Sequence, residues 1–206
     1  MQKHSIKICC FIGHRKIEIT AELKQAIYEY VESLIVNENV KVFLFGSRSQ
    51  FDDLCYEVVS ELQEKYPDID RVYVRSQYEY LGNNYGSYLL QFYEKTTYPE
   101  SCIGAGKLSH IKRNQAMIDQ SDFCLFYYDE NYLPPKRKWA KRDLFAYKPK
   151  SGTALAYKYA QQKKKNIKKI SINVIQNCEI YDIINYLNVN YYFSHSKFSG
   201  GTNEKN

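Results

Sequence analysis

The chain has 206 residues, of which 44% are hydrophobic and 25% are charged, and its formal net charge is +6. These values are ordinary for a globular protein, and the length suffices for one domain with a full core. No apolar run approaches the roughly 18–20 residues that a membrane span needs. The N-terminal apolar stretch is too short for a signal peptide. We therefore expect a cytoplasmic protein that does not contact a membrane.

Cysteine placement argues against a disulfide framework. Cys9, Cys10 and Cys124 lie inside apolar runs, and no C-x-x-C pair is present among the six cysteines. Free cysteines are commonly buried, and structural zinc sites need paired ligands at short spacing. We expect buried thiols, no metal ion and no cofactor.

Apolar runs alternate with amphipathic segments along most of the chain. The runs at 6–12, 40–45, 71–75, 123–128 and 168–175 predict strands. Helices are predicted at 20–36 with Thr20 as the cap, from the turn after residue 45 to Pro67, at 109–120, at 151–164 and at 180–187. Because several runs are apolar throughout, both faces of these strands should be buried. This pattern predicts an α/β three-layer sandwich, with a mostly parallel sheet and helices on both faces.

Two stretches, 76–108 and 129–150, interrupt this alternation. We expect both to be insertions at the rim of the sheet. Residues 1–194 should form a single domain, and the polar residues 195–206 should form a disordered tail.

Glycine, arginine and hydroxyl residues gather where the predicted strands end and helices begin. Parallel sheets bind ligands beyond the carboxyl ends of their strands. Glycine permits close approach of a ligand, a helix N-terminus offers free N–H groups, and arginine is a bidentate donor for phosphate. Tight turns with exposed arginines are the structural alternative. The candidate ligand-binding residues are Gly13, His14, Arg15, Gly46, Ser47, Arg48, Arg113, Asn114, Ser151, Gly152 and Thr153. Within the 109–120 helix, Arg113 and Asn114 are expected opposite or oblique to the apolar residues.

Four segments in this order resemble one family. They are "GHR", "FGSRSQFDDLCYEVV", "RNQAM" and "SGTALAYKYA". Together they are similar to the SLOG superfamily, which comprises Rossmann-like nucleotide-binding domains named for the DNA-processing protein Smf/DprA and the Lonely Guy phosphoribohydrolases. The likeness is greatest to stand-alone YpsA-like members of the bacterial or phage type.

The resemblance implies a Rossmann-like fold and a nucleotide or nucleotide-derived ligand over the strand ends. Its phosphates would meet the helix that begins at Ser151, Gly152 and Thr153. Residues 46–49 would contact the sugar or base, and Asp52 or Asp53 would cap the helix behind them. The alternative is that both aspartates are plain charges at the N-terminus of that helix.

The motif of the hydrolytic relatives is only half present. Lonely Guy enzymes pair an arginine in R-x-x-x-M with a glutamate after G-G-x-G-T, and Arg113 and Met117 match the first half. Ala154 follows Gly152 and Thr153, so the glutamate is missing. This departure favours a sensor or sequestering protein that binds without turnover.

Hydrolysis remains an alternative, because a carboxylate from elsewhere could replace the missing glutamate. Such a nucleotide N-glycosidase or phosphoribohydrolase could use Asp52, Asp129 or Glu130. The sequence assigns no catalytic residue.

Single-stranded nucleic acid is the third candidate ligand. Residues 130–170 hold 13 Lys/Arg against two acidic residues, a net charge of +11, and the rest of the chain carries −5. Within this segment, residues 134–150 interleave basic and aromatic side chains, as in backbone contact with base stacking. The same segment could close over a nucleotide or be a solvated loop. The tyrosine-rich 76–98 stretch could stack on a base, but a homo-oligomer interface is the favoured interpretation.

Overall fold

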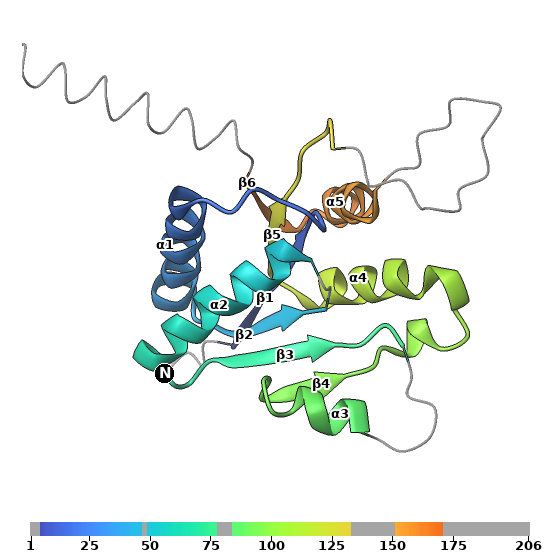
Figure 1. The fold of residues 1–206 in the computed structure, drawn as a ribbon, viewed down its shortest axis with the longest axis horizontal. Helices are drawn as coiled ribbons and strands as arrows, with labels where there is room; N and C mark the ends of the chain where they lie inside the picture. The colour runs from blue at the N-terminus through green and yellow to red at the C-terminus, as the bar shows by residue number, and fades with distance from the viewer. Residues whose placement is uncertain (1–4, 47–48, 78–83, 133–150, 171–206) are drawn as a thin grey trace, which may run out of the picture. The chain divides into compact units, whose positions relative to one another are not determined.

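A computed structural model describes residues 5–46, 49–77, 84–132 and 151–170 (Figure 1). Several predictions therefore lie outside the described residues. They concern Ser47, Arg48, the basic segment 134–150, the strand residues 171–175, the 180–187 helix and the 195–206 tail.

The core of the fold is a six-stranded sheet in the order β4-β3-β2-β1-β5-β6, in which every neighbouring pair is parallel. Its strands are β1 (Lys7–Gly13), β2 (Val40–Phe45), β3 (Asp70–Val74), β4 (Lys95–Thr97), β5 (Phe123–Tyr127) and β6 (Asn166–Ile170). The chain builds outward from β1 to β4 and then returns to place β5 on the other side of β1. The strand order therefore reverses between β1 and β5, which is where open α/β sheets bind ligands.

Helices cover both faces of the sheet, with α1 and α2 on one side and α4 and α5 on the other (Figure 1). Their bounds are α1 (Ala21–Glu38), α2 (Gln50–Lys65), α3 (Asn84–Leu89), α4 (Ser109–Gln120) and α5 (Gly152–Gln162). Two 3-10 turns, η1 (Glu100–Cys102) and η2 (Gly106–Leu108), lead into α4. This three-layer arrangement confirms the predicted Rossmann-like α/β fold.

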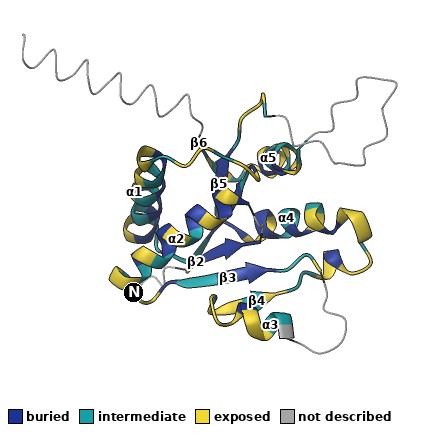
Figure 2. Cartoon of the chain, in the orientation of Figure 1, coloured by how far each residue is buried: buried dark blue, intermediate teal, exposed yellow. Residues whose placement is uncertain are grey.

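Each face of the sheet has its own apolar core, which explains why the strands read as continuous apolar runs (Figure 2). On the α1 and α2 side, the ring of Phe11 lies between Phe43 and Phe45, with centroids 5.9 and 5.0 Å away. The opposite core joins alternate strand residues to α4 and α5, and includes Cys10, Ile12, Leu44, Met117, Ile118, Phe126 and Ala156. Period-2 alternation thus feeds two cores instead of one core and solvent.

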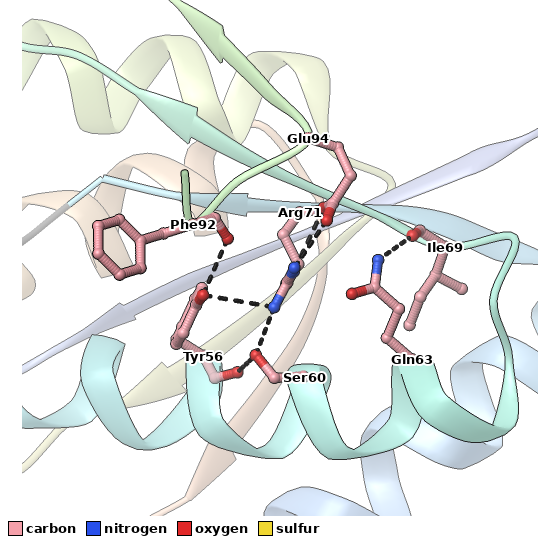
Figure 3. A network of polar contacts seen from close by, with 7 residues as sticks. All are labelled: Tyr56, Ser60, Gln63, Ile69, Arg71, Phe92 and Glu94. Atoms are coloured by element: carbon pink, nitrogen blue, oxygen red, sulfur yellow. Dashed lines mark hydrogen bonds and ion pairs between the residues drawn. The ribbon is translucent and has the colours of Figure 1, made fainter. Parts of the chain in front are cut away.

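The 76–108 insertion extends the sheet, since it contains the edge strand β4. The sequence did not predict this strand, because its three residues, KTT, are partly or fully exposed and form no apolar run. A polar network fastens the insertion to β3 and α2 (Figure 3). The guanidinium of Arg71 donates to Glu94 at 2.7 Å, and the hydroxyl of Tyr56 donates to the carbonyl of Phe92 at 2.8 Å.

Two predicted helix caps had different outcomes. Thr20 caps α1 as predicted, because its Oγ1 accepts from the Leu23 amide at 3.2 Å. The aspartate cap of α2 is wrong: Ser49 is extended and its Oγ accepts from the Asp52 amide at 3.1 Å. Both aspartates lie inside the first turn of the helix, where a negative charge is stabilised by the helix dipole.

The prediction of buried thiols is confirmed for the five cysteines in the described ranges, all of which are free and buried. The helices of these ranges are too short or too polar to span a membrane.

Candidate functional site

The start of α5 is fixed at the end of β1, at the strand-order reversal. The Thr153 hydroxyl donates to the carbonyl oxygen of Gly13 at 2.9 Å. Ser151 caps the helix, because its Oγ accepts from the Ala154 amide at 3.0 Å. Within the described part of the chain, the amides of Gly152 and Thr153 have no acceptor. Free amides at a helix start attract anions.

Open space adjoins these amides. A Cβ placed on Gly152 would meet no atom of the described residues within 4 Å. A groove of about 260 Å³ runs from this point between α4 and α5. Its walls are formed by Ile111, Asn114, Gln115, Gly152, Leu155, Ala156, Lys158, Tyr159 and Gln162. The structure thus brings two of the predicted site residues, Asn114 and Gly152, to the same groove.

At Gly13 and Gly46, the space that a Cβ would occupy is filled by the protein's own side chains. A Cβ on Gly13 would lie 2.3 Å from the Phe51 ring, and one on Gly46 would lie 2.7 Å from Cδ of Arg113 and 2.9 Å from Sδ of Met117. Gly13 therefore packs on α2, and Gly46 packs on Arg113 and Met117 of α4. These two glycines therefore do not leave space for a ligand.

Arg113 is buried, with 4% of its surface exposed. Of the two predicted placements of Arg113, opposite or oblique to the apolar residues of the helix, the opposite one is wrong, because Arg113 and Met117 both pack over Gly46. Its Nε donates to Oδ1 of Asn114 at 2.9 Å. Burial lowers the pKa of the guanidinium, and the negative charge of Asp52 opposes this shift. Arg113 thus lies at the end of β2, where the charge of the buried Asp52 acts on it.

A cationic cluster of Arg15 and Arg113 lies near His110 at this edge of the sheet. Burial lowers the pKa of His110, and the charges of Arg113 and Arg15 lower it further. The backbone of Arg15 is held in place, because its carbonyl accepts from the Gln50 amide at 3.0 Å. The side chain of Arg15 is exposed, so the cluster can reach a ligand in solvent.

His14 is almost fully buried, with 1% of its surface exposed. Its Nε2 accepts from the Asp129 amide at 2.9 Å, and the Tyr132 ring stacks on it with centroids 3.8 Å apart. Burial lowers the pKa of this imidazole. No pattern in the sequence identifies either partner, since both follow β5, more than a hundred residues along the chain.

The three carboxylates considered for catalysis lie in different surroundings. Asp52 is buried, with 3% of its surface exposed, and interacts electrostatically with Arg113. The Asp129 side chain accepts from the Asn131 amide at 2.9 Å. Glu130 forms an ion pair with Lys169 at 3.5 Å and is largely exposed. Among these three, Asp52 is the one held in a buried site beside an arginine.

A family model named YpsA, described as the YspA SLOG family, matches residues 5–177. The match spans most of the chain and both sides of the strand-order reversal, so this protein belongs to that family. A comparison with curated proteins gave no match.

Proposed function

We propose that the protein binds a nucleotide or a nucleotide-derived ligand at the carboxyl ends of β1 and β5, as a sensor or a sequestering protein. The observation that carries the proposal is the meeting of cationic groups with free helix amides. Arg15 and Arg113 form the cationic cluster, and the amides of Gly152 and Thr153 lie next to the end of β1. Phosphate is the ligand group that such a combination favours.

Family membership supports a nucleotide in place of a simple anion. The ligand's phosphates would approach Gly152 and Thr153, where space is open. The remainder would extend over the ends of β1 and β2, toward residues 46–49.

Isothermal titration calorimetry with a panel of purine and pyrimidine nucleoside mono-, di- and triphosphates tests this function. Arg15→Ala should weaken binding about tenfold, as expected for loss of a charge-assisted hydrogen bond. The matched control is Lys112→Ala, which removes one exposed charge from α4 that does not act on His110. Equal losses in both variants would mean non-specific attraction, and no binding by the wild-type protein would refute the proposal.

Nucleotide N-glycosidase activity is the second candidate, and the burial of Asp52 beside Arg113 favours it. Mass spectrometry of a nucleotide incubated with the protein would reveal free base in proportion to protein concentration. Asp52→Asn should abolish that release if Asp52 replaces the missing glutamate. If the nucleotide stays intact after long incubation, hydrolysis is refuted and binding without turnover is the function that remains.

Two partner proposals concern other surfaces. A homo-oligomer through the tyrosine-rich insertion is supported by the exposed side chains of Tyr88, Leu90 and Phe92. Light scattering of wild-type protein and of a Tyr88→Ser/Phe92→Ser variant would test it.

Single-stranded nucleic acid would involve residues 134–150, and its binding should weaken steeply with salt.

A further inference from the structure

Two buried polar atoms near the start of α5 have no hydrogen-bond partner in the described part of the chain. They are Nδ1 of His14 and the hydroxyl of Tyr132. Their rings are stacked at 3.8 Å with an interplanar angle of 12°, so the two atoms belong to one structural unit. A buried polar atom without a hydrogen-bond partner is destabilising, so such a pair calls for a physical explanation.

Two contacts with Asp129 bear on the state of the His14 ring. Nε2 lies 2.9 Å from the Asp129 nitrogen and 3.2 Å from the Asp129 carbonyl oxygen, and the shorter contact is the one in which Nε2 accepts from the backbone N–H. A neutral ring that accepts through Nε2 has its proton on Nδ1. In this tautomer the unpartnered atom of His14 is a hydrogen-bond donor. Burial favours this neutral state, because it lowers the pKa of the ring.

Strand alternation places this donor on the α5 side of the sheet. Cys10 and Ile12 of β1 contribute to the α4 and α5 core, whereas the Cβ position of Gly13 faces Phe51 of α2. His14 continues the series of Cys10 and Ile12. The carbonyl of Gly13, one residue earlier, accepts the Thr153 hydroxyl from the first turn of α5. The imidazole and the first turn of α5 are therefore on the same side of the sheet at the end of β1.

We propose that His14 and Tyr132 form a subsite for a phosphate oxygen of the bound ligand, with His14 donating from Nδ1 as a neutral imidazole. The inference rests on the proposed function, since the phosphate belongs to the nucleotide bound at the same edge. It adds two uncharged donors to the cationic cluster and the helix amides. One of them, Tyr132, comes from the segment that follows β5.

Imidazole NMR of full-length protein labelled with ¹⁵N-histidine tests the tautomer directly. In the ligand-free protein, His14 should show a protonated Nδ1 and an unprotonated Nε2. The tightest-binding nucleotide of the panel should then shift the Nδ1 nitrogen and its proton. The corresponding nucleoside, which has no phosphate, should leave them unchanged. Inorganic phosphate separates recognition of phosphate alone from recognition within a nucleotide. A proton on Nε2, or an unmoved Nδ1 in the nucleotide complex, would overturn the inference.

Two conservative variants give an independent measurement by calorimetry. His14→Gln keeps an acceptor near the Nε2 position for the Asp129 amide but removes the Nδ1 donor, and should weaken nucleotide binding about tenfold. Tyr132→Phe keeps the stacked ring and removes only the hydroxyl, and should weaken it about threefold. Tyr66→Phe is the matched control, because the Tyr66 hydroxyl bonds to Glu32 at the far end of α2.

The outcomes separate this inference from the proposed function. Wild-type binding that His14→Gln and Tyr132→Phe leave unchanged would refute the subsite and retain the function. Absence of nucleotide binding by the wild-type protein would refute both. Circular dichroism of each variant shows whether a loss of affinity reflects unfolding.

Discussion

Gly13 and Gly46 differ from Gly152 in how much space surrounds them. Gly13 ends a strand, Gly46 follows one and Gly152 begins a helix, and all three lie at the carboxyl ends of the strands. The Cβ positions of the first two are filled by Phe51 and by Arg113 with Met117, whereas no atom of the described ranges lies within 4 Å of the Cβ position of the third. A glycine in such a motif therefore does not by itself indicate a ligand site. The residues packed around its Cβ position determine whether a protein side chain or a ligand can occupy that space.

The largest effect should come from Gly13→Ala. The new methyl would lie 2.3 Å from Cδ1 and 2.6 Å from Cβ of Phe51, which is fully buried and close to the backbone of α2. Overpacking of this kind should lower the free energy of unfolding by about 3 kcal/mol. Urea denaturation would measure it.

A double mutant tests whether Phe51 is the cause. Phe51→Leu removes ring atoms from the clash, so Gly13→Ala/Phe51→Leu should lose less stability than the sum of the single variants. Additive losses would show that Gly13 is required for another reason.

Gly46→Ala should have a smaller effect on stability, about 1–2 kcal/mol. Its neighbours are Arg113 and Met117, whose long side chains can shift where the Phe51 ring cannot. The shift should displace the guanidinium and weaken nucleotide binding as well. Denaturation and calorimetry on the same variant measure both effects. A loss of stability as large as that of Gly13→Ala would contradict this distinction.

Most of the fold could be predicted from the sequence because hydrophobic burial determines it. The apolar runs of β1, β2 and β5 and the amphipathic pattern of α1 and α4 are direct consequences of their packing. β4 was missed, since a three-residue edge strand gains its place from the sheet and from the Arg71–Glu94 bonds more than from its own side chains.

The site was predictable only in outline. Motif residues identify the edge of the sheet, but they cannot show that Arg113 turns inward over Gly46. Nor can they show that His14 meets Asp129 and Tyr132. These contacts join residues far apart in sequence, and no local period or capping rule encodes them. The same limit explains the wrong cap of α2, where Ser49 and Asp52 compete and backbone conformation decides.

Lowering the pH should reduce the free energy of unfolding through His14, which belongs to the part of the site that is filled by protein side chains. An unfolded imidazole has a pKa of about 6.5, and burial lowers the pKa of His14 in the folded state. Between these two values the unfolded chain binds more protons, so the free energy of unfolding falls as the pH is lowered. His14→Gln should lose less stability than the wild type between about pH 7.5 and 5.5. Urea midpoints at both pH values measure this, and equal losses would mean that His14 is not shielded from water.

The smallest effect on stability, with a clear effect on binding, should come from Gly152. Gly152→Ala adds a methyl in open space, so the free energy of unfolding should change by no more than about 0.5 kcal/mol. Gly152→Asp should even stabilise α5 slightly, because a negative charge at a helix N-terminus is favourable. Both should weaken nucleotide binding, the aspartate more strongly, since its charge repels the phosphate that the amides attract. Stability and affinity would then change in opposite directions at one position. That result requires a ligand close to the helix start, whereas unchanged affinity in Gly152→Asp would mean that the open space holds only solvent.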